Sequence, residues 1–202
     1  MDAWSGWEHW YEVVETSTLR QGDVLANLLV FWFPQDLPVR DADPPEGRLD
    51  VVAEWDRGTW IVMSASCDVD REAARYPQVL MGRVAPATRA VLNQQTEKDL
   101  KTRLEVIRRG LDPSAFLLAP HPNDPPFPLS VVQWRMHVTL PVEYVRRAAT
   151  GRRLRLKSPY RESFGNWVGG NIERVGPEDS TAVPKFRDTV WPEHVLRSSE
   201  EQ

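Results

Sequence analysis

Ser66, Cys67 and Asp68 place a hydroxyl, a thiol and a carboxylate next to one another in the chain. They follow the apolar run 60–63, which is typical of a buried strand, and a rigid strand fixes the polar groups at its end. A cysteine nucleophile needs a base and a lowered thiol pKa. Asp68 and Asp70 disfavour a thiolate, because they bring negative charge close to it. The cluster predicts either a catalytic site or a packed thiol at a strand end.

His121 and His137 are the candidate bases for this thiol, and their sequence positions leave their distance from it open. The carboxylates that could bind a divalent cation are Asp23, Asp50, Asp68 and Asp70. They lack the ligand spacing of a known metal motif, and acids at turns commonly cap backbone amides instead. The chain also lacks a Gly-rich phosphate loop and a zinc-ligand pattern. We therefore expect no metal and no cofactor.

The densest charge feature is a basic segment at 146–161, which holds seven Arg or Lys residues and no acid in an otherwise acidic chain. Arginine at this density suits phosphate or carboxylate recognition, and nearby Tyr160 and Trp167 could stack on bases. The predicted binding residues are Arg152, Arg153, Arg155, Lys157, Tyr160 and Arg161. The alternatives are a solvated surface, pairing with the protein's own acids, and contact with an acidic protein partner.

Composition limits the class of protein. The chain has 202 residues, 41% of them hydrophobic, with a net charge of −4. This charge gives no global basic field for nucleic acid. A single cysteine fits a reducing compartment. The N-terminus lacks the pattern of a signal peptide, and the longest apolar run is too short for a membrane span. We expect a cytoplasmic protein with no membrane contact.

The hydrophobic patterns predict strands and helices in turn. Apolar or alternating runs predict strands at 24–33, 78–84, 116–119 and 130–140, and a hairpin turn at 56–58 that leads into a strand from 60. Spacings of three and four predict one long helix within 88–109 and shorter helices at 141–149 and from 158. The aromatics of 2–16 predict a short helix or a loop held down on the core. Residues 1–176 then form one α+β domain, and 177–202 form a polar tail laid over the surface.

Two stretches resemble a group of poorly characterised bacterial and phage proteins. One is Ser64-Ala65-Ser66-Cys67-Asp68, which matches a Ser-x-x-Cys-Asp pattern, and the other is Ser158-Pro159-Tyr160-Arg161-Glu162. A second resemblance is to PemK/MazF-type small barrels, through Gly22-Asp23-Val24 and Ile61-Val62-Met63-Ser64. Gly58-Thr59-Trp60 stands where that family has Arg-Pro, so we take over its architecture and not its catalysis. The expected fold is an antiparallel, SH3-like or PemK-like curved β-sheet or barrel with one long helix and a helical C-terminal end.

Two functional hypotheses follow. The first is a non-catalytic binding component of a bacterial conflict or phage-defence module, a setting implied by the resemblance. It would contact nucleic acid, or an acidic protein partner encoded in the same multi-gene module, through the basic segment. The second is a toxin-like endonuclease or other hydrolase with its site at Ser66, Cys67 and Asp68.

Overall fold

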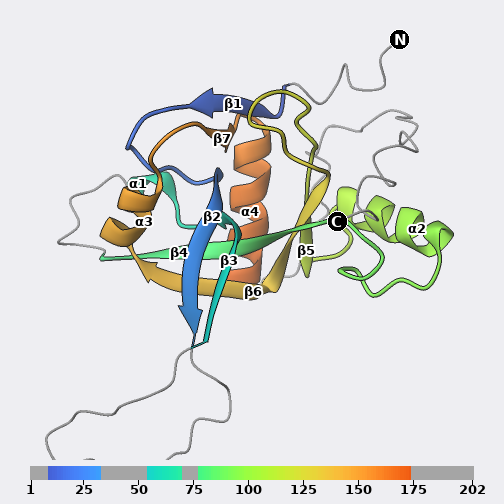
Figure 1. Ribbon diagram of the computed structural model, residues 1–202. Helices are drawn as coiled ribbons and strands as arrows, with labels where there is room; N and C mark the ends of the chain where they lie inside the picture. Colours follow the sequence, from blue (N-terminus) through green and yellow to red (C-terminus); the bar gives the residue numbers. More distant parts are fainter. Residues whose placement is uncertain (1–8, 33–53, 70–76, 174–202) are drawn as a thin grey trace, which may run out of the picture.

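A seven-stranded antiparallel sheet forms the centre of the protein, in a computed structural model that describes residues 9–32, 54–69 and 77–173 (Figure 1). The strand order is β1-β7-β2-β3-β4-β6-β5. The strands are β1 (Tyr11–Val14), β2 (Asp23–Trp32), β3 (Glu54–Val62), β4 (Gln78–Pro86), β5 (Ala115–Leu118), β6 (Ser130–Pro141) and β7 (Arg153–Leu156). The helices are α1 (Ser66–Val69), α2 (Glu97–Arg108), α3 (Val142–Ala148) and α4 (Tyr160–Glu173). The predicted α+β class and antiparallel pairing are confirmed.

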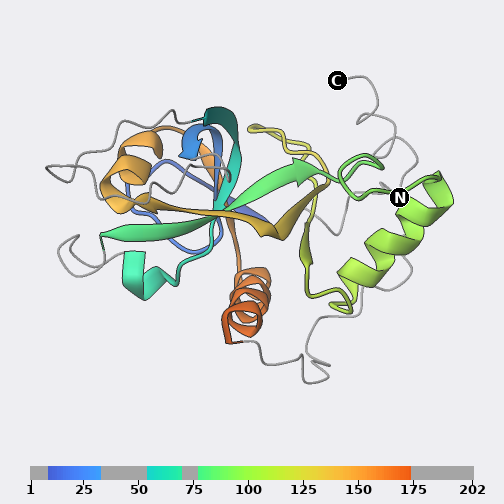
Figure 2. The same cartoon turned by 90° about the horizontal axis from the view of Figure 1, so that it is seen from below.

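Two separate apolar cores lie on the two faces of this sheet. One core contains Ile61 of β3 together with Leu104 of α2 and Phe164 of α4. The other contains Trp60 of β3 and Val145 of α3. Adjacent residues of β3 therefore point into different cores, as the period-two geometry of a strand requires. Figure 2 shows α4 beneath the sheet, away from α3.

Two irregularities interrupt the register of the sheet. In β2 the register shifts between Leu25 and Leu28, and Asn27 adopts a left-handed conformation with φ of 57°. In β6 residues 133–136 lie opposite the single residue Arg83 of β4. Bulges of this kind curve a strand and redirect its side chains.

Helix α2 begins later than its apolar spacing indicates. The predicted helix covered 88–109, whereas residues 89–93 form turns and the helix starts at Glu97. Thr96 and Asp99 form a capping box, in which each side chain bonds the backbone N–H of the other residue. This box satisfies amide donors at the first turn and so defines the start of the helix. Helix α2 contains 12 residues, which is shorter than expected, and α4, with 14 residues, is the helix predicted from 158.

Two further local predictions are wrong. Residues 56–58 continue β3 without a turn, because they pair in antiparallel register with residues 28–30 of β2. The segment around Tyr11 forms β1 and not a helix, because it pairs with β7. Trp4 and Trp7, with the predicted tail 177–202, lie outside the described residues.

Candidate functional site

The turn before β2 joins two distant parts of the chain. The amide of Gly22 donates to the carbonyl of Val62 at 2.9 Å, and its carbonyl accepts from the amide of Leu156 at 3.1 Å. Gly22 has φ of 85°, and a Cβ there would lie 2.9 Å from the Leu156 Cβ. Only glycine fits this conformation and this close approach. The Gly22-Asp23-Val24 motif is thereby held between the end of β3 and the basic strand β7.

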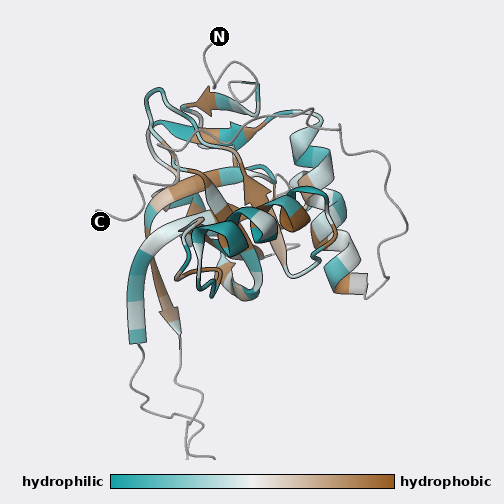
Figure 3. Cartoon of the chain, turned by 90° about the vertical axis from the view of Figure 1, so that its right-hand side faces the viewer, coloured by the Kyte–Doolittle hydropathy of each residue, from teal (hydrophilic) through white to brown (hydrophobic). Residues whose placement is uncertain are grey.

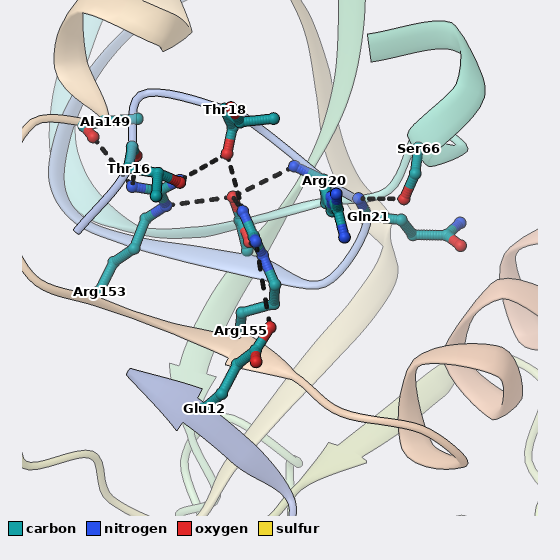
Figure 4. Close-up of polar contacts among 10 residues, drawn as sticks. Glu12, Thr16, Thr18, Arg20, Gln21, Ser66, Ala149, Arg153 and Arg155 are labelled. Carbon is teal, nitrogen blue, oxygen red and sulfur yellow. Dashed lines mark hydrogen bonds and ion pairs between the residues drawn. The ribbon is translucent and has the colours of Figure 1, made fainter. Parts of the chain in front are cut away.

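Asp23 binds two arginines of the basic segment in the protein interior. Figure 4 labels these arginines, Arg153 and Arg155, and their backbone partners. Its Oδ2 accepts from Arg153 Nε at 3.1 Å and from Arg155 Nη2 at 3.0 Å. Its Oδ1 accepts from Arg155 Nε at 2.5 Å. Asp23 is fully buried, and each arginine is only 5% exposed. We call Asp23, Arg153 and Arg155 the buried ionic cluster.

Backbone carbonyls take up further donors of the buried ionic cluster. Arg153 donates to the carbonyls of Thr16, Thr18 and Ala149 at 2.5, 2.7 and 3.1 Å, and Arg155 also donates to Thr18 at 2.7 Å. A buried charge is tolerable only when it is paired and hydrogen-bonded in this way. Both arginines were predicted to bind a ligand, and the structure places them where they hold the loop before β2 against β7.

The other predicted binding cations lie outside the core: Arg152 and Lys157 are exposed, and Arg161 is half-buried. Arg152 pairs with Asp124 and with Glu15, whose Oε1 is 3.2 Å from Arg152 Nε. Lys157 is exposed at the end of β7, and its side chain makes no ion pair within the described ranges. Arg161 pairs with Glu162 at 2.9 Å. The predicted binding residues are thus divided between the interior and the surface.

Lys157, Tyr160 and Arg161 lie together at the beginning of α4. The amide of Arg161 donates to the carbonyl of Lys157 at 2.9 Å. The Tyr160 ring stacks on Trp10 at 4.2 Å between centroids, and its partial burial raises the pKa of the phenol. We call Lys157, Tyr160 and Arg161 the α4 surface.

Glu162 is a carboxylate in the first turn of α4, and its pKa is lowered there. Its carboxylate loses some hydration, which acts to raise the pKa. Its own backbone amide, Arg161 and Ser158 outweigh this effect and hold the pKa of Glu162 below its usual value. Stabilisation of a carboxylate in the first helical turn is the expected result of free amides and a positive helix end.

The predicted catalytic residues share one short helix. Ser66, Cys67 and Asp68 form most of α1, and the Ser66 Oγ accepts from the amide of Gln21 at 3.2 Å. The Cys67 thiol is exposed and donates to Asp68 Oδ1 at 3.6 Å. Gln21 also donates from Nε2 to the Met63 carbonyl at 2.8 Å. Cys67 thus contacts Asp68, while the Ser66 hydroxyl is engaged by Gln21, which links α1 to the turn that carries Asp23.

Both candidate bases have other neighbours. The Nδ1 of His121 lies 3.0 Å from the carbonyl of Pro125, and its ring packs edge-on against Tyr11. The Nδ1 of His137 lies 2.6 Å from the carbonyl of Trp134. Within the part of the chain that the structure describes, neither imidazole hydrogen bonds Cys67. The only thiol partner found there is the Asp68 carboxylate.

Among the described residues, no three His, Cys, Asp or Glu side chains lie together in a group that could hold a metal ion. Asp50 and Asp70, two of the four carboxylates considered as ligands, lie outside those residues. In the same ranges, no helix is long and apolar enough to cross a bilayer.

No known family model matches the chain. No curated protein matches it either.

Sequence reasoning missed two features. It did not assign Asp23 as the partner of Arg153 and Arg155, although the Gly-Asp-Val motif and the basic segment were both identified. It also overlooked the exposed aromatic residues Phe31 and Trp55. The signal for Trp55 was its position between the acids Glu54 and Asp56, which places the acids on one face of a strand and Trp55 on the other.

Proposed function

We propose that this protein is a non-catalytic binding component of a bacterial conflict or phage-defence module. In this proposal it contacts nucleic acid or an acidic protein partner through the exposed part of its basic segment. The observation that carries the proposal is the α4 surface, where Lys157 and Arg161 occupy one turn beside Tyr160. The single cysteine supports a cytoplasmic location.

The buried ionic cluster holds in place the strand that leads into this surface. Arg153 and Arg155 fix β7, and β7 ends at Leu156, directly before Lys157. A surface whose backbone is held in place loses less conformational entropy when it binds. The Arg161–Glu162 pair is open to solvent, with Glu162 exposed and Arg161 half-buried, and such pairs contribute little stability. A phosphate or a partner carboxylate can therefore replace Glu162 at small cost.

We also propose that the sheet has the strongly curved, SH3-like or PemK-like architecture that the sequence resemblance implies. Two observations support this proposal: the bulge at Asn27 in β2 and the bulge at 133–136 in β6. Both lie within long strands, where a local kink turns the rest of the strand out of the plane of the sheet.

The test of the binding proposal is a matched pair of charge reversals. One double variant combines Lys157→Glu and Arg161→Glu. The control combines Lys98→Glu and Lys101→Glu, which make the same charge change on the exposed side of α2. The probes are a fluorescein-labelled single strand, a duplex of the same sequence, and a poly-glutamate peptide, each titrated at two salt concentrations.

We expect the α4 variant to bind its preferred probe at least about tenfold more weakly than the control variant. If the probe is nucleic acid, the dependence of log K on log salt should flatten by about 0.7–0.9 for each phosphate that the variant no longer neutralises. Circular dichroism and thermal melting check that both variants are folded. Equal weakening by the two double variants would show a general charge effect and contradict the α4 surface as the binding site.

A hydrolase centred on Ser66, Cys67 and Asp68 is the second candidate function. The observation that favours it is the exposure of the Cys67 thiol on α1, with a hydroxyl and a carboxylate beside it. Cys67→Ala and Asp68→Ala test it in a cell-toxicity assay and in a cleavage assay on RNA and DNA. A hydrolase of this kind should lose its activity in both variants, and full retained activity would exclude this site.

A further inference from the structure

The outer end of the β2–β3 hairpin carries an exposed aromatic pair. Phe31 and Trp55 are direct cross-strand partners, and they are 55% and 63% exposed. Arg57 follows two positions after Trp55 on the same face of β3 and is also exposed. We call Phe31, Trp55 and Arg57 the hairpin face. Two large aromatic side chains exposed side by side are uncommon unless they contact a ligand or a partner.

Acidic side chains are kept on the opposite face of the hairpin. Glu54 and Asp56 alternate with Trp55 and Arg57, so they point the other way. Glu54 accepts from the Trp32 indole at 2.9 Å, and Asp56 lies 2.6 Å from Arg83. The Arg57 guanidinium makes no ion pair within the residues that the structure describes. The hairpin face is therefore apolar and positively charged, although the whole protein is acidic.

The body of the protein holds this face in position. Val30, the neighbour of Phe31 on β2, is fully buried. The Tyr144 hydroxyl of α3 donates to the carbonyl of Leu29 at 2.5 Å. Figure 3 shows the paired ends of β2 and β3 extending past the helices, with the apolar end of β2 beside the more hydrophilic beginning of β3. The two rings are thus presented on a preformed support and remain accessible.

We propose that the hairpin face binds single-stranded nucleic acid. Two bases stack on Phe31 and Trp55, and the Arg57 guanidinium contacts a phosphate. Aromatic residues on neighbouring strands serve this purpose in general, because every base has a π-face and a sheet spaces the rings regularly. This site is separate from the α4 surface, and the inference does not depend on the function proposed for that surface.

The size of the hairpin face favours a nucleic acid over a protein partner. An aromatic side chain contributes at most about 150–250 Å² of contact area. Two such side chains fall far short of the roughly 800 Å² per partner that a stable protein interface buries. Stacked bases need only the area of the rings, and the guanidinium beside them supplies the complementary charge.

The experiment titrates the full chain with fluorescein-labelled oligo-dT and oligo-U and measures anisotropy. The variants are Phe31→Ala, Trp55→Ala, Trp55→Phe and Arg57→Ala. The matched controls are Leu111→Ala, which removes an apolar side chain that is 66% exposed, and Arg20→Ala, which removes an exposed arginine. Every substituted position is exposed, so thermal melting should show the wild-type midpoint for each variant.

We expect each ring deletion to weaken binding by between about fivefold and a hundredfold, which is the usual range for loss of one stacked base. Trp55→Phe should retain most of the affinity, because it keeps a ring. Arg57→Ala should also lower the salt slope by about 0.7, the value for one phosphate of a single strand. The Leu111 and Arg20 controls should bind like the wild type.

Several results would overturn the inference. They are the absence of binding by the wild type, wild-type affinity in both ring deletions, and equal affinity for a duplex of the same length. A change in oligomeric state by sedimentation, without a change in oligonucleotide affinity, would assign the hairpin face to contacts between copies of the chain and contradict the proposal. Loss of binding only in Lys157→Glu with Arg161→Glu would contradict this site and leave the α4 surface supported.

Discussion

Asp23→Ala should destabilise the protein by about 3–5 kcal/mol, the usual cost of removing one partner from a buried ion pair. Asp23 is fully buried and accepts three hydrogen bonds from Arg153 and Arg155. Its loss leaves two guanidinium groups in the interior, and Glu12, 3.9 Å from Arg155, is half exposed and so compensates them poorly. A domain is typically stable by only about 5–15 kcal/mol, so this loss is a large fraction of the total.

Equilibrium unfolding in urea measures this change as a shift of the midpoint at constant slope. The matched control is Asp124→Ala, which removes an exposed carboxylate from Arg152 and should cost less than about 1 kcal/mol. Asp23→Asn retains one acceptor oxygen and should give an intermediate loss, which keeps the comparison measurable if the alanine variant does not fold. A loss in Asp23→Ala no greater than that in Asp124→Ala would refute the reasoning about the buried ionic cluster.

Two further predictions concern packing and pH. Gly82→Ala should destabilise the protein by about 1–3 kcal/mol in the same urea assay, because a Cβ there would lie 2.7 Å from Val132 Cγ1 and 2.8 Å from Met63 Sδ. A wild-type midpoint in that variant would show that these side chains move aside freely. Hydrogen bonding and charge from Arg108, with Arg109, lower the pKa of Glu105 despite partial burial. The resulting stability is present above the unfolded-state pKa near 4.5 and is lost as the pH falls through the lower folded-state pKa. Glu105→Gln should therefore show a smaller fall in melting temperature on acidification than the wild type, and an equal fall would contradict this.

Most strands could be predicted because their own runs of apolar residues are enough to indicate a strand. The runs in β2, β4, β5 and β6 are long enough to identify a strand without knowledge of its partner. The start of α2 was harder to predict. The helical spacing of apolar residues extends upstream as far as Leu92, whereas the capping box at Thr96 and Asp99 sets the boundary. Turn and cap chemistry at single residues outweighs the periodicity of the surrounding segment.

The role of β7 could not be read from its own sequence. Arg153-Leu154-Arg155-Leu156 alternates in the way that indicates one wet and one buried face. All four residues are buried, because β7 lies between β1 and β2 and its arginines meet Asp23 about 130 positions earlier in the chain. Pairing with the protein's own acids was one of the alternatives drawn from the sequence. Arg153 and Arg155 form such pairs, both with the distant Asp23.

The position of β7 between the first two strands also has a consequence for folding order. As the chain is synthesised, β1 and the near edge of β2 have no sheet partner until the ribosome has released residues 153–156. Asp23 must meanwhile remain hydrated or accept temporary donors, because both of its arginines are still to come. Contacts of such long sequence separation slow folding, since the loop must close before they form. The last short strand therefore completes the sheet, and nascent chains that stop before it should lack the β1-β7-β2 side of the fold.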